Sequence, residues 1–175
     1  MPDSYTEVQK KITKESIFTA LMKLLEKNQF NEVTITQITN LAGVSRMAFY
    51  RNYNVKEDII IIYLDELFDE FMNEVKSSRS SEKYDVALLY FSYFKERKDF
   101  IEVLIKSGLI YIFYDRLSCY LFNFLESIGG NNLPYNNYLT RYASGGLYSI
   151  LIEWINNDTK ESVEEMAKLI AEINI

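Results

Sequence analysis

Residues 33–60 read VTITQITNLAGVSRMAFYRNYNVKEDII, and this stretch decides the fold of the N-terminal part of the chain. Thr34 lies three residues before Gln37, which is the spacing of a capping box at the start of a helix. Apolar residues then recur at helical intervals as far as Gly43, a residue that suits the left-handed backbone at a helix end. Ser45 can cap a second helix. The pattern therefore predicts two short helices joined by a tight glycine turn, a helix-turn-helix.

The outer surface of the expected second helix indicates a partner. With Phe49 on the buried side, a step of 100° per residue points Met47 and Arg51 outward, with Arg46 and Tyr50 to either side. The segment RMAFYRNY contains two arginines and three aromatic residues but no acid, whereas a solvated face normally carries Glu and Lys. Arginine binds phosphates and guanine edges, and tyrosine reaches phosphates or thymine methyls. The surface favours nucleic acid, although spacing alone also fits any two amphipathic helices joined by glycine.

The stretch from Thr34 to Ile59 resembles the signature of the TetR family of bacterial transcriptional regulators, approximately T-[VI]-x-x-[IL]-[AT]-x-x-A-G-V-[SA]-x-x-x-[LF]-Y-x-[HYN]-[FY]-x-x-K-[ED]-x-[IL]. The match has no gap and follows one expected helix, as in that family. Met47 stands where a small residue is usual, and Asn52 replaces the commoner His or Tyr, so the operator sequence is left open. The resemblance implies that these residues contact or position double-stranded operator DNA: Thr34, Thr36, Ser45, Arg46, Met47, Tyr50, Arg51, Asn52, Tyr53 and Lys56.

Composition excludes several classes of protein. The chain has 175 residues, of which 48% are hydrophobic, with only two prolines and six glycines, as suits an all-helical fold. With no histidine and one cysteine, the usual metal ligands, the usual general base and an internal disulfide are all missing, so we expect no cofactor, no metal and no enzymatic activity. The apolar runs are far shorter than the ~20 residues of a membrane span, and the polar N-terminus contains no secretory signal. We therefore expect a cytoplasmic protein that does not associate with membranes.

Charge is distributed unevenly along the chain. The overall net charge is −6, which by itself argues against nucleic acid. Residues 1–56, however, hold eight basic and five acidic residues, a net charge of +3, whereas residues 57–175 hold eleven basic and twenty acidic residues, a net charge of −9. A basic head on an acidic body is the polarity expected if only the head approaches phosphates.

We expect an all-α chain of about nine helices. Residues 1–53 would form a three-helix DNA-binding head, and residues 54–175 a helical body for effector binding and dimerisation. One long helix, Asn54 to Lys76, would run from the head into the body. The Ser-rich segment 77–81 predicts a linker, and residues 129–134, which contain two glycines and a proline, predict a loop.

The last two expected helices have more apolar surface than one body can bury. Gly145 and Gly146 lie in succession inside the first of them, where each costs roughly 1 kcal/mol relative to alanine, and close approach of another helix would compensate. We therefore expect these two helices to form a four-helix interface in a homodimer. The alternative is that their apolar surface is buried entirely within a monomer. The resemblance implies the same, because the family dimerises through its final two helices and needs two heads to read a pseudo-palindromic operator. The candidate interface residues are Tyr138, Tyr142, Gly145, Gly146, Ser149, Ile150, Val163, Met166 and Ile170.

The body is rich in aromatic residues. The resemblance implies a pocket there for a small effector, and an aromatic lining would suit an apolar or aromatic effector. Plain core packing explains the same residues equally well. Arg116 and Arg141 are candidates for an anionic effector, and Cys119 is expected to be a buried small hydrophobe. The candidate pocket residues are Tyr90, Phe94, Tyr111, Tyr114, Leu117, Cys119 and Phe122. The expected function is a homodimeric repressor released from its operator by the effector; the alternative is a DNA-binding co-regulator or activator whose body docks a partner protein.

Overall fold

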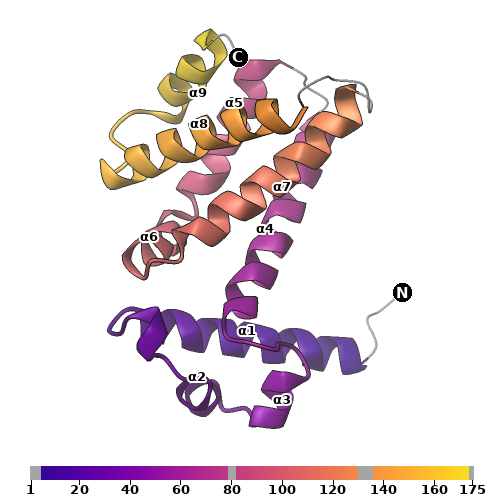
Figure 1. The fold of residues 1–175 in the computed structure, drawn as a ribbon, viewed down its shortest axis with the longest axis vertical. Coiled ribbons are helices and arrows are strands. Elements are labelled where there is room, and N and C mark those ends of the chain that lie inside the picture. The colour runs from indigo at the N-terminus through magenta and orange to yellow at the C-terminus, as the bar shows by residue number, and fades with distance from the viewer. Residues whose placement is uncertain (1–4, 79–81, 130–135, 174–175) are drawn as a thin grey trace. The chain divides into compact units, whose positions relative to one another are not determined.

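The computed structural model of the chain describes residues 5–78, 82–129 and 136–173. Within these ranges the chain forms nine α-helices, one short 3-10 helix and no strand, which confirms the expected all-α class (Figure 1). The elements are α1 (Tyr5–Leu25), the 3-10 helix η1 (Phe30–Glu32), α2 (Ile35–Ala42), α3 (Arg46–Tyr50), α4 (Glu57–Ser78), α5 (Lys83–Lys95), α6 (Lys98–Lys106), α7 (Ile110–Gly129), α8 (Asn136–Asn156) and α9 (Val163–Glu172). Most of the expected linker at residues 77–81 and of the expected loop at 129–134 lies outside the described residues.

The chain divides into two compact units. The first, called the head, comprises the residues up to Leu64 together with Val103–Leu109. The second, called the body, comprises Asp65–Glu102 and the residues from Ile110 onward. Helices α4 and α6 thus contribute residues to both units. The head extends past residue 53, and the functional boundary expected there stays a prediction.

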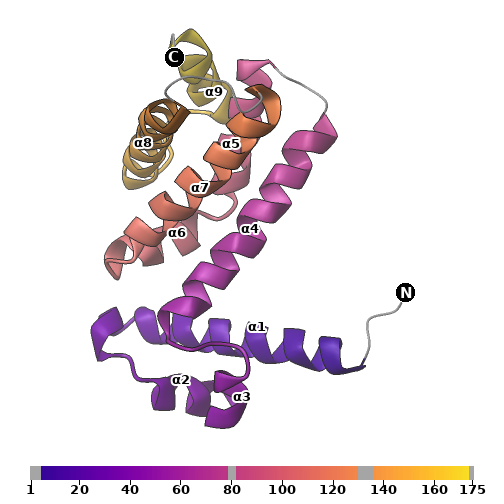
Figure 2. The same cartoon turned by 45° about the vertical axis from the view of Figure 1, so that its right-hand side comes forward.

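The head is held together by a small apolar core. Helix α1 packs against α2 and lies across α2 and α3 in both ribbon views (Figures 1 and 2). Ile17 and Leu21 of α1, Ile38 of α2 and Phe49 of α3 are completely buried. Burial of such a side chain contributes roughly 1.5–3 kcal/mol, so these four residues account for much of the stability of a unit this small.

Helix α4 begins at Glu57, three residues later than the sequence predicted. The Asp58 carboxylate accepts hydrogen bonds from the backbone N–H groups of Asn54 (2.7 Å) and Val55 (3.1 Å). These bonds hold the preceding residues in a turn, so the helix starts only after it. The acid at the helix start also interacts favourably with the helix dipole.

The core of the body is aromatic. Phe94 of α5 lies at its centre, with ring centroids 4.9 Å from Tyr90, 5.2 Å from Phe113 and 5.7 Å from both Phe68 and Phe71. Around this cluster α5 packs on α9, and α7 packs on α8. Aromatic pairs at such distances contribute about 0.5–1.5 kcal/mol each beyond their burial, so much of the aromatic content serves packing.

None of the helices in the described ranges is both long enough and apolar enough to cross a lipid bilayer. The described side chains also contain no group of three or more acidic or cysteine ligands that could hold a metal ion.

Candidate nucleic-acid interface

The turn between α2 and α3 has the geometry that the sequence predicted. Gly43 adopts φ +68°, ψ 28°, in the left-handed region. Its N–H donates to the Asn40 carbonyl (3.3 Å), and the Val44 N–H donates to the Thr39 carbonyl (3.0 Å), which together form a Schellman motif. A Cβ added at Gly43 would meet no atom within 4 Å, so the backbone conformation, not lack of space, requires glycine there.

The underside of α3 fixes its orientation. The Ser45 hydroxyl accepts the Ala48 N–H (3.0 Å) at the start of the helix. Phe49 is 0% exposed, and its ring centroid lies 5.5 Å from that of Tyr53, which is 4% exposed. At the end of the helix the Asn52 side-chain N–H donates to the Ala48 carbonyl (2.8 Å). The helix is short, but it is capped at both ends and anchored by two buried rings.

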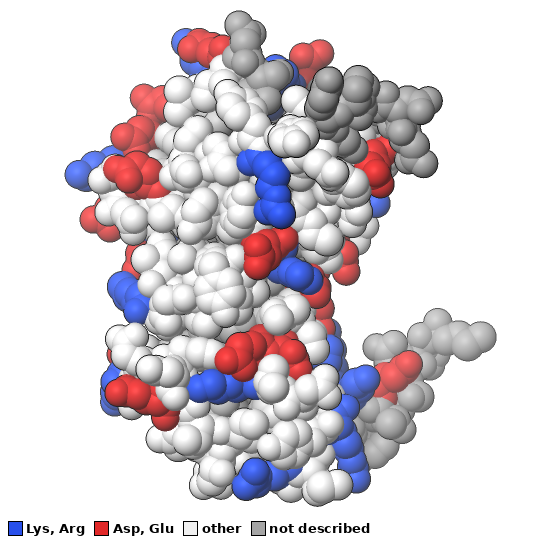
Figure 3. Space-filling view, in the orientation of Figure 1, with Lys and Arg blue, Asp and Glu red and all other residues white. Residues whose placement is uncertain are grey.

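The outward side of α3 consists of the residues that sequence analysis placed there. Met47 is 67% exposed and Tyr50 is 47% exposed, and Arg46 and Arg51 are also exposed. In the described part of the chain neither guanidinium is paired with a carboxylate. On the face shown in Figure 3, Lys and Arg but no Asp or Glu lie along the outer edge of the region that α2 and α3 occupy in Figure 1. This surface presents cations and an aromatic hydroxyl with no competing acid.

The other predicted contact residues differ in how much of each side chain is available to DNA. The Thr34 backbone N–H donates to the Gln37 side-chain carbonyl (2.8 Å), and the Thr34 hydroxyl accepts the Gln37 N–H (3.2 Å), which together form the predicted capping box. Thr36 is exposed. Asn52 is half-buried, and its Oδ1 atom is buried without a hydrogen-bond partner among the described residues. Tyr53 is too deeply buried for its ring face to meet a ligand.

Lys56 has an internal role that sequence analysis missed. Its ammonium group donates to the carbonyls of Phe30 (2.6 Å) and Val33 (2.8 Å) and lies 4.4 Å from the centroid of the Phe30 ring. Two of its three N–H donors are therefore used inside the head. The family resemblance implied a DNA contact for Lys56, whereas its carbonyl partners lie more than twenty residues away in the sequence, and no local sequence pattern indicates them.

The expected effector-pocket residues differ in burial, and their grouping around an effector stays a prediction. Tyr90, Phe94 and Leu117 are buried, and Tyr90 and Phe94 belong to the aromatic core. Tyr111 is 55% exposed. Tyr114 and Phe122 are half-buried on α7. The expectation that Cys119 is buried is wrong, since the thiol is exposed. Helical periodicity explains this, because Cys119 shares a face of α7 with exposed Tyr111 and Asp115.

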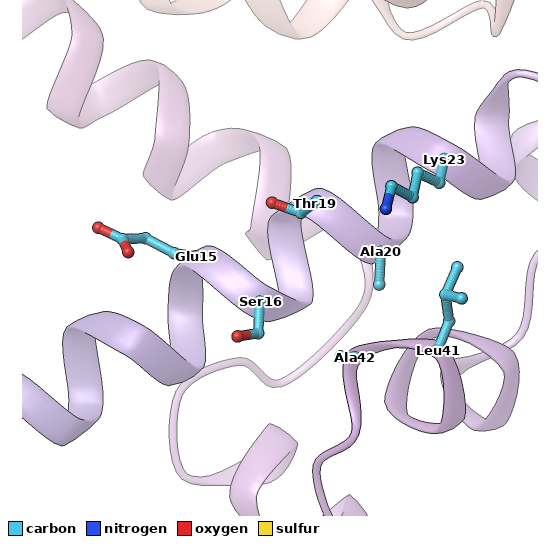
Figure 4. Close-up of a pocket in the computed structure, with 7 residues that line it drawn as sticks. All are labelled: Glu15, Ser16, Thr19, Ala20, Lys23, Leu41 and Ala42. Atoms are coloured by element: carbon cyan, nitrogen blue, oxygen red, sulfur yellow. The ribbon is translucent and has the colours of Figure 1, made fainter.

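A groove of about 330 Å³ lies in the head, between α1 and α2 (Figure 4). Leu41 of α2 points toward α1 near Ala20 and Lys23, and Glu15 lies at the other end of the groove. Leu41 is half-exposed.

Polar contacts between body helices were not predicted from the sequence. The Ser118 hydroxyl of α7 donates to the Ser144 hydroxyl of α8 (2.9 Å), and both residues are buried. The pKa of Tyr114 is lowered because hydrogen bonds stabilise its phenolate form. The largest effect comes from the Arg141 guanidinium, and the hydroxyls of Ser144 and Ser118 contribute less. Small polar residues within apolar helices give no signal that identifies their partners.

The candidate interface residues on α8 and α9 differ in exposure. Tyr138 is 75% exposed, Tyr142 is 61% exposed and Ser149 is exposed, whereas Met166 is 7% exposed. The remaining residues are half-buried: Gly145, Gly146, Ile150, Val163 and Ile170. A Cβ added at either glycine would meet no atom of the described residues within 4 Å, so none of these residues approaches the glycines closely from another element.

Comparison with known proteins identifies the class to which this fold and surface belong. A TetR family model, described as a transcriptional regulator C-terminal region, matches residues 81–174, more than half of the chain. The chain therefore belongs to the TetR family of transcriptional regulators. Members of this family are generally not enzymes. No curated protein matches the chain in sequence.

Solved structures share the fold at low sequence identity. Lin0861 from Listeria innocua superposes with a TM-score of 0.82 at 17% identity, covering 98% of this chain and 93% of that chain. A TetR transcriptional regulator from Streptococcus agalactiae gives 0.66 at 22% identity, covering 95% of each chain. FadR from Bacillus subtilis in complex with stearoyl-CoA gives 0.54 at 16% identity, covering 90% of this chain and 95% of that chain.

Proposed function

We propose that the protein is a homodimeric repressor that binds a pseudo-palindromic operator through α3 of each protomer and is released by a small effector. The observation that carries the DNA-binding part is the acid-free outward surface of α3, held in place by fully buried Phe49. Arg46 and Arg51 have the donor geometry for guanine edges or phosphates, and the Tyr50 hydroxyl can reach a phosphate. The proposal places the protein with the chromosome, in the cytoplasm.

Residues around α3 would position the DNA backbone. Exposed Thr36 can donate its hydroxyl proton to a phosphate, and the caps formed by Thr34 and Ser45 lie at the starts of the two helices. Lys56 retains one N–H after its two internal hydrogen bonds. Asn52 and Tyr53 would act mainly by holding the end of α3 in place.

Dimerisation through α8 and α9 is supported by the surface of α8. Tyr138 and Tyr142 expose large aromatic side chains that a single chain leaves in water. Gly145 and Gly146 destabilise the helix relative to alanine, and among the described residues no atom lies within 4 Å of a Cβ added at either position. A partner helix packed against them would compensate. Two copies also double the modest positive charge of the head, which strengthens attraction to phosphates.

Effector control requires the body to influence the spacing of two heads. Helix α4 is continuous from Glu57 to Ser78 and contributes to both units, so we propose that it transmits movements of the body. The stearoyl-CoA complex of FadR, at a TM-score of 0.54, supports a small effector in a related fold. An apolar or aromatic ligand would enter the body beside α7, where Tyr114 and Phe122 are half-buried.

A second candidate is a co-regulator or activator whose body docks a partner protein. It is favoured by the exposed Tyr138, Leu139 and Tyr142 on α8. Dimerisation would cover the same residues. A concentration series by analytical ultracentrifugation separates the two, because self-association without added protein supports the interface over a docking surface.

Gel retardation tests DNA binding directly. On a duplex selected by the wild-type protein, Arg46→Ala and Tyr50→Ala should abolish retardation while leaving the oligomeric state intact. Lys23→Ala is the matched control, because it removes one positive charge from an exposed position of the head outside α3. Retardation by both α3 variants equal to that of the control would refute the proposed interface.

A further inference from the structure

Met47 is the apolar centre of the outward surface of α3. It is 67% exposed, which is more than any other large hydrophobic residue of the head among those described. Arg46 precedes it and Arg51 follows one turn later, so a cation lies on either side of the thioether. On a surface proposed to bind DNA, this exposed apolar side chain is placed to contact an apolar group of the duplex.

The chemistry of the side chain restricts what that contact can be. A thioether donates no hydrogen bond and accepts only weakly, so it cannot read the donor and acceptor pattern of base edges. The C5 methyl of thymine is the one apolar group that an unmodified base pair presents in the major groove. Methionine is unbranched and flexible, and it adapts its shape to such a group more readily than a branched side chain does.

The local structure holds Met47 where it can make this contact. The Ser45 cap and the buried Phe49 fix the helix on both sides of it, and the Met47 side chain remains mostly exposed. We propose that Met47 is a specificity-determining residue that packs on a thymine C5 methyl in each operator half-site. This inference rests on the proposed DNA binding, and it adds a base preference that follows from the departure at position 47.

The experiment removes only the methyl group. Duplexes are first selected by the wild-type protein from a random pool, and each thymine is then replaced by deoxyuridine, which keeps all hydrogen-bonding groups of the base. Replacing the contacted thymine in one half-site should weaken binding about four-fold. Replacing it in both half-sites should weaken binding about fifteen-fold. Met47→Ala should bind the thymine duplex more weakly and should no longer distinguish it from the deoxyuridine duplex.

Two control variants make the result specific. Met47→Leu keeps an apolar side chain of similar volume and should retain the preference for thymine. Leu41→Ala removes a comparably exposed apolar side chain of the head outside α3 and should leave it unchanged. A preference for thymine that persists in Met47→Ala, or no effect of deoxyuridine at any position, would overturn the inference. Failure to select any duplex would instead refute the proposed DNA binding.

Discussion

The Tyr120 hydroxyl of α7 donates to the Asp69 carboxylate of α4 across 2.9 Å, and it lies 3.0 Å from the Asp65 carbonyl. Beside it, the Arg116 guanidinium lies 3.5 Å from the Asp65 carboxylate. These contacts tie α7 to the helix that contributes to both units. They place a polar attachment on the element through which we propose that the body acts on the head.

Loss of this attachment should weaken the body modestly. Tyr120→Phe removes the hydroxyl and retains the ring, which stacks on Phe68 at 5.3 Å. We expect the free energy of unfolding to fall by about 1 kcal/mol, measured by urea denaturation. Tyr111→Phe is the control, since Tyr111 is 55% exposed on the same helix and should change stability little. Equal losses in the two variants would show that the hydrogen bond to α4 contributes nothing.

Stability should fall at alkaline pH because of the buried tyrosines. Burial raises the pKa of Tyr90, Tyr93 and Tyr120 well above the ordinary value of 10.0, with hydrogen bonding to Asp69 adding to the effect at Tyr120. Since the folded-state pKa is raised, this contribution is fully present below pH ~10, where unfolded tyrosine is still protonated, and is lost progressively at higher pH. Urea denaturation from pH 8 to 11 checks the sign. A free energy of unfolding that stays constant or rises above pH 10 would contradict it.

The Gly145→Ala variant distinguishes the effect of this glycine on helix stability from its effect on dimer packing. The added Cβ meets no atom within 4 Å in the part of the chain that the structure describes, so the variant should gain up to about 1 kcal/mol of helix stability. At a closely packed dimer interface the same methyl group should weaken association. Sedimentation equilibrium should therefore show a raised dimer dissociation constant with no loss of helicity by circular dichroism. Dimerisation equal to or stronger than that of the wild type would exclude close packing at Gly145.

Lys56 should matter for folding of the head. Lys56→Met keeps much of the aliphatic stem but leaves the carbonyls of Phe30 and Val33 without their donor. Hydrogen bonds to a charged group are worth about 1.5–3 kcal/mol, and solvent at this half-buried site reduces that, so we expect a loss of about 1–2 kcal/mol. Hydrogen exchange of amides in α2 and α3 measures it. Unchanged protection would mean that the ammonium group does not hold the two carbonyls in solution.

The sequence was most informative where structure depends on local chemistry. Gly43 and Ser45 fix a backbone conformation and a cap, so the turn and the outward face of α3 followed from their positions. The position of Cys119 was predicted wrongly because composition says that cysteine is often buried, whereas the face of α7 decides it. Lys56 and the pair Ser118–Ser144 find partners far along the chain, and single-sequence patterns contain no information about such contacts.

The most direct test of the central claim is the accessibility of α3 on DNA. Met47→Cys places a thiol at the centre of the outward surface, and native Cys119, which is exposed on the body, serves as an internal reference. Alkylation rates of the two thiols are compared without DNA and with a saturating amount of selected duplex. We expect the thiol at position 47 to be strongly protected by the duplex while that of Cys119 reacts at an unchanged rate. Equal reactivity at position 47 with and without bound duplex would contradict the account.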